Sequence, residues 1–248
     1  MQFKNNTRHS AQLAHADNHI PVQIICEQRG DVRMGISSKA AILRLPNYLP
    51  TTEQAKHWQK FADWVFVHFQ KDEKLRSRFF GKKYRNGDKL ELYGRTYTLR
   101  IQESADRKNH HGKIEGREIQ LDLVAADHNP QKAIRTLISR CVAADIHPDF
   151  ERRVHEINDS FVNKPIKGVV LKQQASKWGS CSSGNNLNFS TNLLFAPPAV
   201  IDYVIIHELA HLVEFNHSPA FWSLVEKRCP HYLQAEKWLK VNGHTCAF

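Results

Sequence analysis

The segment from Tyr203 to Trp222 constrains the fold of this chain more than any other. It reads YVIIHELAHLVEFNHSPAFW, which places an HExxH pentad in an apolar stretch and a further histidine six positions later. Residues four apart share one face of an α-helix, so His207 and His211 can hold one metal ion while Glu208 lies beside it. The segment is therefore typical of the metal-binding helix of a zinc hydrolase.

A catalytic zinc ion takes three protein ligands and leaves one position for water. We predict His217 as the third ligand, because Asn216 can end the first helix in a left-handed conformation. Ser218 and Pro219 then read as the cap and the first residue of a second helix, which places the histidine in a tight corner. The alternative third ligands are Glu214 and His231.

Glu208 is adjacent to His207 and cannot readily join the same helical pair as a ligand. It can instead accept a proton from a metal-coordinated water and pass it to the leaving group. Tyr203, one helical turn before His207, can donate a hydrogen bond to the oxyanion, and core packing is its alternative role. Ser180 and Cys181 have the side chains of nucleophiles, but the sequence supplies no paired base for them.

The pentad is short, and it also occurs in helices whose histidines are only surface residues. Here apolar residues surround it on nearly every side: Val204, Ile205, Ile206, Leu209, Leu212 and Val213. This pattern predicts a buried helix, in which His and Glu side chains without partners would be costly and a bound cation would remove the cost. The context therefore favours one bound zinc ion over a fortuitous motif.

Composition predicts a globular chain with a positive electrostatic field. Of the 248 residues, 41% are hydrophobic, and the formal net charge is +10. Such a field attracts anionic partners, among them nucleic acid and nucleotides, but the basic clusters match no base-reading motif. The five cysteines are odd in number and form no CxxC pair, which favours reduced thiols in the cytoplasm. No apolar run has the length of a signal-peptide core or of a membrane span.

The first half of the chain predicts a small antiparallel sheet and one amphipathic helix. From Glu53 the helix carries four large apolar side chains at helical spacing, which makes them core residues rather than a base-stacking surface. Residues 1–20 are expected to be a flexible tail, and residues 103–116 a mobile loop whose His110 and His111 are an alternative metal site. The helix side chains are Trp58, Phe61, Val65 and Phe69, and the expected strands are 22–26, 33–36, 41–45, 90–92, 96–101 and 118–123.

The second half is expected to become helical before the metal-binding helix. Proline and capping residues predict one helix over about 129–144 and another over about 148–162. A strand at 169–171 follows, and then a hairpin whose turn is 182–186. An edge strand can hold an extended peptide by backbone hydrogen bonds. Leu187–Leu193 is the strand we expect at such an edge, with an ordinary hairpin over the core as the alternative.

Three motifs follow one another near the C-terminus: WGSC before a strand rich in asparagine and leucine, then YVIIHELAHL, then NHSPAFW. Together they resemble the YgjP-like metallopeptidases, a zincin family related to the SprT-like proteases. The resemblance is specific over Trp178–Trp222 and implies Glu208 as the catalytic acid and base. The zinc ligands that it implies are His207, His211 and His217.

The strand and helix patterns, together with this resemblance, predict an α+β fold, in which a small antiparallel β-rich region precedes a zincin-like helical metallopeptidase domain with a short β-hairpin. The expected divisions are a flexible tail at 1–20, a β-rich region with one amphipathic helix at 21–125, and the metallopeptidase domain at 126–248.

The expected function is hydrolysis of peptide bonds in a protein or peptide substrate, with Glu208 activating water at one zinc ion. Two alternatives stay open: a metal-dependent hydrolase of nucleotides or other phosphorylated substrates, and a DNA-associated protease or binding module. A cytoplasmic protein with no membrane partner is expected.

Overall fold

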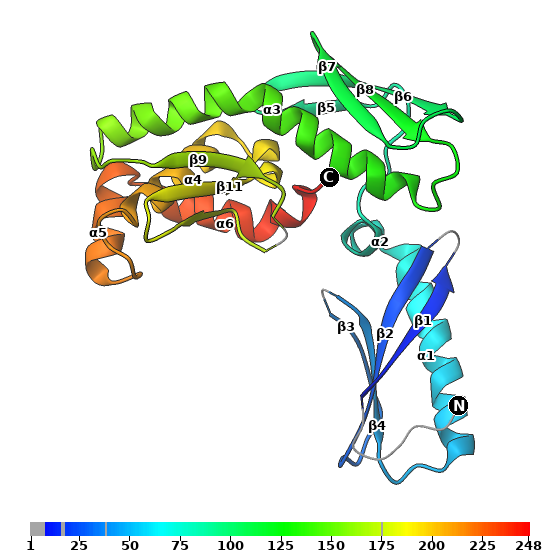
Figure 1. The fold of residues 1–248 in the computed structure, drawn as a ribbon. Coiled ribbons are helices and arrows are strands. Elements are labelled where there is room, and N and C mark those ends of the chain that lie inside the picture. The colour runs from blue at the N-terminus through cyan, green and yellow to red at the C-terminus, as the bar shows by residue number, and fades with distance from the viewer. Residues whose placement is uncertain (1–7, 16–17, 38, 175) are drawn as a thin grey trace. The chain divides into compact units, whose positions relative to one another are not determined.

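The chain divides into two units, Met1–Lys82 (unit 1) and Lys83–Phe248 (unit 2). This division differs from the expected one after residue 125, because the strands between residues 89 and 124 share one core with the helix that begins at Pro130. Both units combine strands with helices, so the expected α+β class is confirmed. The computed structural model, drawn in Figure 1, describes residues 8–15, 18–37, 39–174 and 176–248.

Unit 1 is a four-stranded sheet, in the order β1-β2-β4-β3, with helix α1 packed on it (Figure 1). β2 and β4 are parallel, so the sheet is mixed and not purely antiparallel as expected. The predicted aromatic core is confirmed, because Phe61 and Phe69 of α1 are completely buried with the sheet residues. The elements of unit 1 are β1 (Arg8–His15), β2 (Asn18–Glu27), β3 (Arg33–Ile36), β4 (Ala41–Pro46), α1 (Thr51–Lys71) and α2 (Glu73–Phe80).

The described part of the expected N-terminal tail is not a loose segment. β1 pairs with β2 in an antiparallel hairpin, from Arg8 opposite Ile25 to His15 opposite Asn18. Leu13 on β1 is buried in the core of unit 1, although the rest of this strand consists of polar residues and alanine. A strand needs only every second side chain on the buried face, so a polar terminus can still add to a sheet. Residues 1–7 and 16–17 lie outside the described part of the chain.

Unit 2 is organised around the long helix α3 (Pro130–Asp159), which packs against two sheets (Figure 1). The expected loop at 103–116 contains a strand, β7, that lies at the edge of the first sheet. Gly112 permits this packing, because a β-carbon there would lie 2.9 Å from the Cys141 Sγ on α3. The first sheet has the order β5-β6-β8-β7, with β5 (Lys89–Leu92), β6 (Arg95–Ser104), β7 (His111–Glu115) and β8 (Glu118–Val124).

Helix α3 continues through Pro148, so the two helices that we expected are one. A proline inside a helix removes one backbone hydrogen bond and strains the preceding turn. Ile146, Phe150 and Val154 on both sides of the proline are completely buried. Packing of this apolar face therefore outweighs the local preference for a break, which the sequence pattern did not reveal.

The second sheet has the order β10-β11-β9, and its hairpin is confirmed. The predicted edge strand is wrong: β11 pairs on its other side with β9 and lies in the middle of the sheet. Leu187 and Phe189 of β11 are completely buried, which explains why this strand takes the central position. β10 and β9 lie at the two edges of this sheet. The strands are β9 (Gly168–Lys172), β10 (Gly179–Cys181) and β11 (Asn186–Ser190), followed by the short 3-10 helix η1 (Thr191–Phe195).

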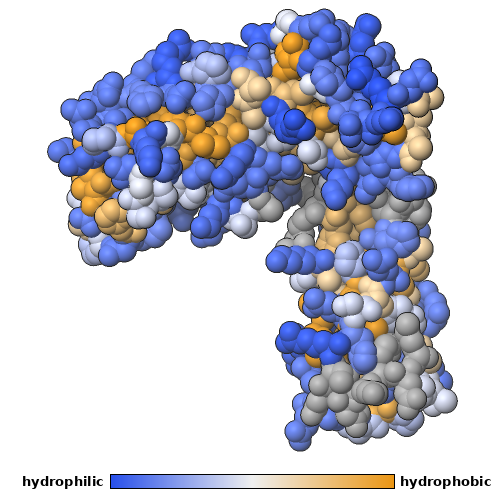
Figure 2. Space-filling model, viewed as in Figure 1, coloured by the Kyte–Doolittle hydropathy of each residue, from blue (hydrophilic) through white to orange (hydrophobic). Residues whose placement is uncertain are grey.

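Three helices follow in unit 2 and carry most of the candidate site. Most of the surface in view in Figure 2 is hydrophilic. Within the described residues, no helix combines the length and the apolarity that crossing a membrane requires. The helices are α4 (Pro198–Ala210), α5 (Pro219–Arg228) and α6 (Tyr232–Asn242), and the 3-10 helix η2 (Gly243–Thr245) follows them.

Phe150 lies at the centre of the core of unit 2. Its side chain is 0% exposed, and its ring centroid is 5.0 Å from that of Phe189 and 5.9 Å from that of Tyr93. Phe150→Ala leaves a cavity, so we expect the free energy of unfolding of unit 2 to fall by about 3–5 kcal/mol in urea titrations followed by circular dichroism. Leu233→Ala, at a side chain that is 62% exposed, is the control and should change it by less than about 0.5 kcal/mol. Equal effects of the two variants would contradict this account of the core.

Candidate metal centre

Helix α4 carries the HExxH pentad and ends inside it. Pro198 occupies the first turn, and Ala210 is the last helical residue, with His211 as the C-cap in the right-handed helical region. Because His211 keeps helical dihedral angles, its side chain remains on the same face as that of His207 one turn earlier. The two imidazole centroids are 5.1 Å apart. The local sequence thus brings two histidines together as predicted.

The turn between α4 and α5 adds His217 to this pair. Asn216 is not among the described residues with positive φ, so the left-handed conformation that we expected is wrong. Its side-chain oxygen instead accepts a hydrogen bond of 3.1 Å from the backbone N–H of Ser218, which caps α5 as predicted. This arrangement puts the His217 ring centroid 5.0 Å from that of His207 and 4.9 Å from that of His211.

The three imidazoles, which we call the histidine cluster, converge on one point. One ring nitrogen of each lies within 4.8 Å of the others, and the Nε2 atoms of His207 and His217 are 3.1 Å apart. Two nitrogens bound to one tetrahedral zinc ion at 2.0–2.1 Å are separated by about 3.3 Å. The spacing therefore suits a single ion. Within the described chain, the alternative ligands Glu214 and His231 do not belong to this group.

Burial favours the neutral, cation-binding form of two of the three imidazoles, those of His207 and His211. Burial, together with the other two histidines, lowers the pKa of His207 to about 4. Burial also lowers the pKa of His211, although its hydrogen bond with the Glu214 carbonyl opposes this shift. That bond joins Nδ1 of His211 to the carbonyl oxygen of Glu214 over 3.0 Å, and Nε2 of His211 takes no part in it. A hydrogen bond at one ring nitrogen orients the other for metal binding.

Two aromatic residues of α5 hold the histidine cluster in place. Phe221 is completely buried, and its ring centroid lies between 4.6 and 4.9 Å from the three imidazole centroids. Trp222 stacks on His217 at 5.8 Å and on Tyr232 at 5.3 Å. Rings packed on several sides lose rotational freedom, which preorganises a binding site. Our sequence analysis missed this support, whose signal was the Phe-Trp pair at helical spacing from His217.

Glu208 lies next to the histidine cluster and against β10. Its side chain is nearly completely buried, and a β-carbon on Gly179 would lie only 2.7 Å from its Oε1 atom. Burial raises the pKa of Glu208 to about 7, against the opposing effects of a hydrogen bond from the Cys181 backbone and the charge of Lys177. A carboxyl group that titrates near neutrality can both accept and return a proton. The glycine was visible in the WGSC motif, but its contact with the carboxyl group depends on the tertiary structure.

A small recess, which we call the Trp178 pocket, opens beside His207. Its volume is about 280 Å³. Tyr203, which we considered as a donor or as a core residue, is 5% exposed and forms one wall of this recess. The remaining lining residues are Trp178, Val204, Glu236, Leu239 and Lys240.

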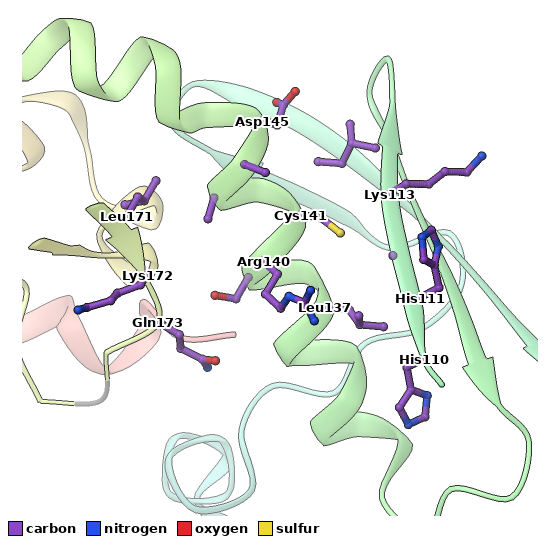
Figure 3. A pocket seen from close by; sticks show the side chains of 15 residues that line it. His110, His111, Lys113, Leu137, Arg140, Cys141, Asp145, Leu171, Lys172 and Gln173 are labelled. Carbon is purple, nitrogen blue, oxygen red and sulfur yellow. The ribbon is translucent and has the colours of Figure 1, made fainter. Parts of the chain in front are cut away.

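A larger hollow of about 790 Å³ lies elsewhere on unit 2, between α3, β7 and β9 (Figure 3). His110 and His111, the alternative metal ligands, line this hollow and do not join the histidine cluster. His110 is engaged locally, since its Nδ1 accepts a hydrogen bond of 3.1 Å from Val124 and its Nε2 is 3.1 Å from Asp127. Among the described residues, the histidine cluster and not the larger hollow groups the ligand atoms that could hold a metal ion.

A sequence profile described as YgjP-like, metallopeptidase domain, matches residues 31–242. No curated protein matches the chain. The structure has similarity to the crystal structures of two metallopeptidase zymogens. Abylysin of Pyrococcus abyssi is 22% identical, with a TM-score of 0.35, over 37% of this chain and 92% of abylysin. Jannalysin of Methanocaldococcus jannaschii is 23% identical, with a TM-score of 0.31, over 36% of this chain and 96% of jannalysin.

The profile spans most of the chain, including the histidine cluster, Glu208 and β10. It therefore confirms the resemblance carried by the WGSC, HELAH and NHSPAFW motifs. The chain belongs to the YgjP-like family and carries its metallopeptidase domain.

Proposed function

We propose that this protein is a zinc-dependent peptidase in which the histidine cluster holds one zinc ion and Glu208 is the catalytic acid and base. The main support is the convergence of three imidazole nitrogens within 4.8 Å beside a buried carboxyl group. A zinc ion held by three imidazoles supplies a Lewis acid and lowers the pKa of a coordinated water to about 7. The metallopeptidase match favours peptide bonds over phosphorylated substrates, and no observation favours the DNA-associated alternative.

The protein's own contribution to the reaction is proton transfer and positioning. Glu208, held by Gly179 and the Cys181 backbone, can accept a proton from the attacking water and deliver it to the leaving amine. Tyr203, like any tyrosine, is protonated near neutral pH, and burial raises its pKa further, to about 12. Its ring centroid is 6.0 Å from that of His207. We assign its hydroxyl group as the side-chain donor to the oxyanion on the basis of this proximity.

The edge of β10 is where we expect the substrate backbone. β11 pairs with one side of β10, which leaves the other side without a strand partner among the described residues. Such an edge can pair with an extended peptide by backbone hydrogen bonds. Because Gly179 and Cys181 both contact Glu208, a peptide in this position would bring its scissile bond to the carboxyl group. The substrate should therefore be an unfolded or extended segment.

Metal analysis combined with digestion of unfolded proteins tests this proposal. Protein treated with a chelator and then reloaded should bind one zinc ion per chain and release peptides that mass spectrometry can identify. Peptide release should increase in proportion to zinc occupancy. Zinc binding without cleavage in a panel of unfolded proteins, or hydrolysis of nucleoside triphosphates alone, would contradict the peptidase assignment.

Gly179→Ala should disturb Glu208 without touching the zinc ligands. The new β-carbon would lie 2.6 Å from Cγ and 2.7 Å from Oε1 of Glu208, so the carboxyl group must move. A displacement of about 1 Å can cost about 100-fold in rate, and we expect kcat to fall by this amount with zinc content unchanged. Gly184→Ala in the same hairpin is the control, since its nearest neighbour would be 3.5 Å away. Equal kcat values for the two variants would show that β10 does not position Glu208.

A further inference from the structure

The Trp178 pocket is large enough to hold one amino-acid side chain. Its volume of about 280 Å³ falls below the roughly 300–1,000 Å³ typical of sites for small-molecule ligands. The pocket adjoins His207, and two of its walls lie on α4 one helical turn earlier. Trp178 directly precedes β10. A peptide paired with the edge of β10 would therefore pass the mouth of the pocket with one residue beside it.

Neighbouring residues fix the shape of the pocket before any substrate arrives. Tyr203 stacks on Tyr232, with the ring centroids 6.4 Å apart and the ring planes 25° apart. Trp178 contacts Gly243 so closely that a β-carbon there would lie 2.7 Å from the indole Cζ2. A preformed wall binds its ligand without the entropic cost of ordering side chains. The close contact with Gly243 thus fixes the position of the Trp178 indole ring against the C-terminal segment.

The lining determines which side chains the pocket can accept. Trp178, Tyr203 and Leu239 present apolar surface. Glu236 and Lys240 carry opposite charges one turn apart on α6, so together they give the pocket no net charge. A charged substrate side chain would lose hydration there without a net electrostatic gain. The chemistry of the walls therefore favours a neutral, apolar occupant.

We propose, on the basis of the proposed peptidase function, that the Trp178 pocket binds a large apolar substrate side chain next to the scissile bond. Leucine, methionine and phenylalanine are the side chains that it would accept. Trp178 is the residue that determines this specificity, and Gly243 is the residue that positions it. Apolar pockets of this kind discriminate by about 10- to 200-fold between side chains that differ in size.

Peptides that differ at a single position flanking the cleavage site test this specificity. We expect the zinc-loaded protein to show a leucine-to-alanine ratio of kcat/KM of about 10 to 200, and an aspartate peptide to be no better than the alanine peptide. Trp178→Ala should bring that ratio close to one. Gly243→Ala should also change the ratio, because the new methyl group would collide with the Trp178 indole ring and displace it. Leu233→Ala on α6 is the matched control and should retain the parental ratio.

Binding measured without turnover separates this inference from the peptidase assignment. Calorimetric titration of Glu208→Gln protein with the same peptides should give tighter binding of the leucine peptide, and Trp178→Ala in that background should abolish the difference. If this preference is observed but no peptide is cleaved by the parent protein, the peptidase function fails and the pocket assignment stands. Cleavage that favours small or charged side chains, or a leucine preference that survives Trp178→Ala, would overturn the pocket assignment.

Discussion

Glu208→Gln is expected to lower the kcat for peptide hydrolysis by about 10²- to 10⁴-fold while the protein keeps its zinc ion. The amide has nearly the shape of the carboxyl group but cannot accept a proton from water and return it to the leaving group. The side chain is 6% exposed and lies against Gly179, so solvent cannot readily take over its role. Single-turnover cleavage of a fluorogenic peptide, together with zinc analysis of the same sample, measures both quantities.

Glu214→Gln is the matched control for this substitution. Glu214 follows the pentad closely, but it contacts His211 through its backbone carbonyl, which the substitution leaves unchanged. We therefore expect the parental kcat and zinc content. If Glu208→Gln protein hydrolyses peptides as fast as the parent, Glu208 has no part in proton transfer. If Glu214→Gln is the slower variant, the roles of the two residues are reversed.

His217→Ala is expected to weaken zinc binding by more than 100-fold. Losing a residue that only orients a ligand typically costs about 10- to 100-fold in metal affinity, and losing a ligand should cost more. Only the two imidazoles from the α4 pentad would remain, and two ligands do not complete a catalytic zinc site. Competition with a chromophoric chelator measures the dissociation constant, and peptidase activity at a fixed zinc concentration should fall with occupancy.

His231→Ala serves as the control, because this exposed histidine lies outside the histidine cluster and makes no side-chain cap to α6. Its zinc affinity should equal that of the parent. Undiminished zinc binding by His217→Ala would move the third ligand elsewhere, and Glu214 would be the first residue to test. A loss of affinity in His231→Ala similar to that in His217→Ala would show that the effect is not specific to the cluster.

Local sequence patterns predicted those parts of the fold whose partners lie close in the chain. The spacing of Phe61, Val65 and Phe69 identified a buried helix face, and the Ser218–Pro219 pair identified the start of α5. The same reasoning failed at Pro148, where tertiary packing on both sides keeps one helix continuous. It also failed for β11, since a strand becomes central or peripheral according to partners that lie far away in the sequence.

The sequence by itself determined that His207 and His211 share a helix face, because the helical repeat fixes that relation. It also indicated His217 as a third member, although the turn forms through the Asn216 side chain and not through a left-handed residue. Only the tertiary structure decided that β10 is an edge strand, that Phe221 contacts all three imidazoles and that Trp178 lines a pocket beside His207. Each of these contacts is made between segments that lie apart in the sequence. They depend on how the whole core packs, which no local repeat in the sequence encodes.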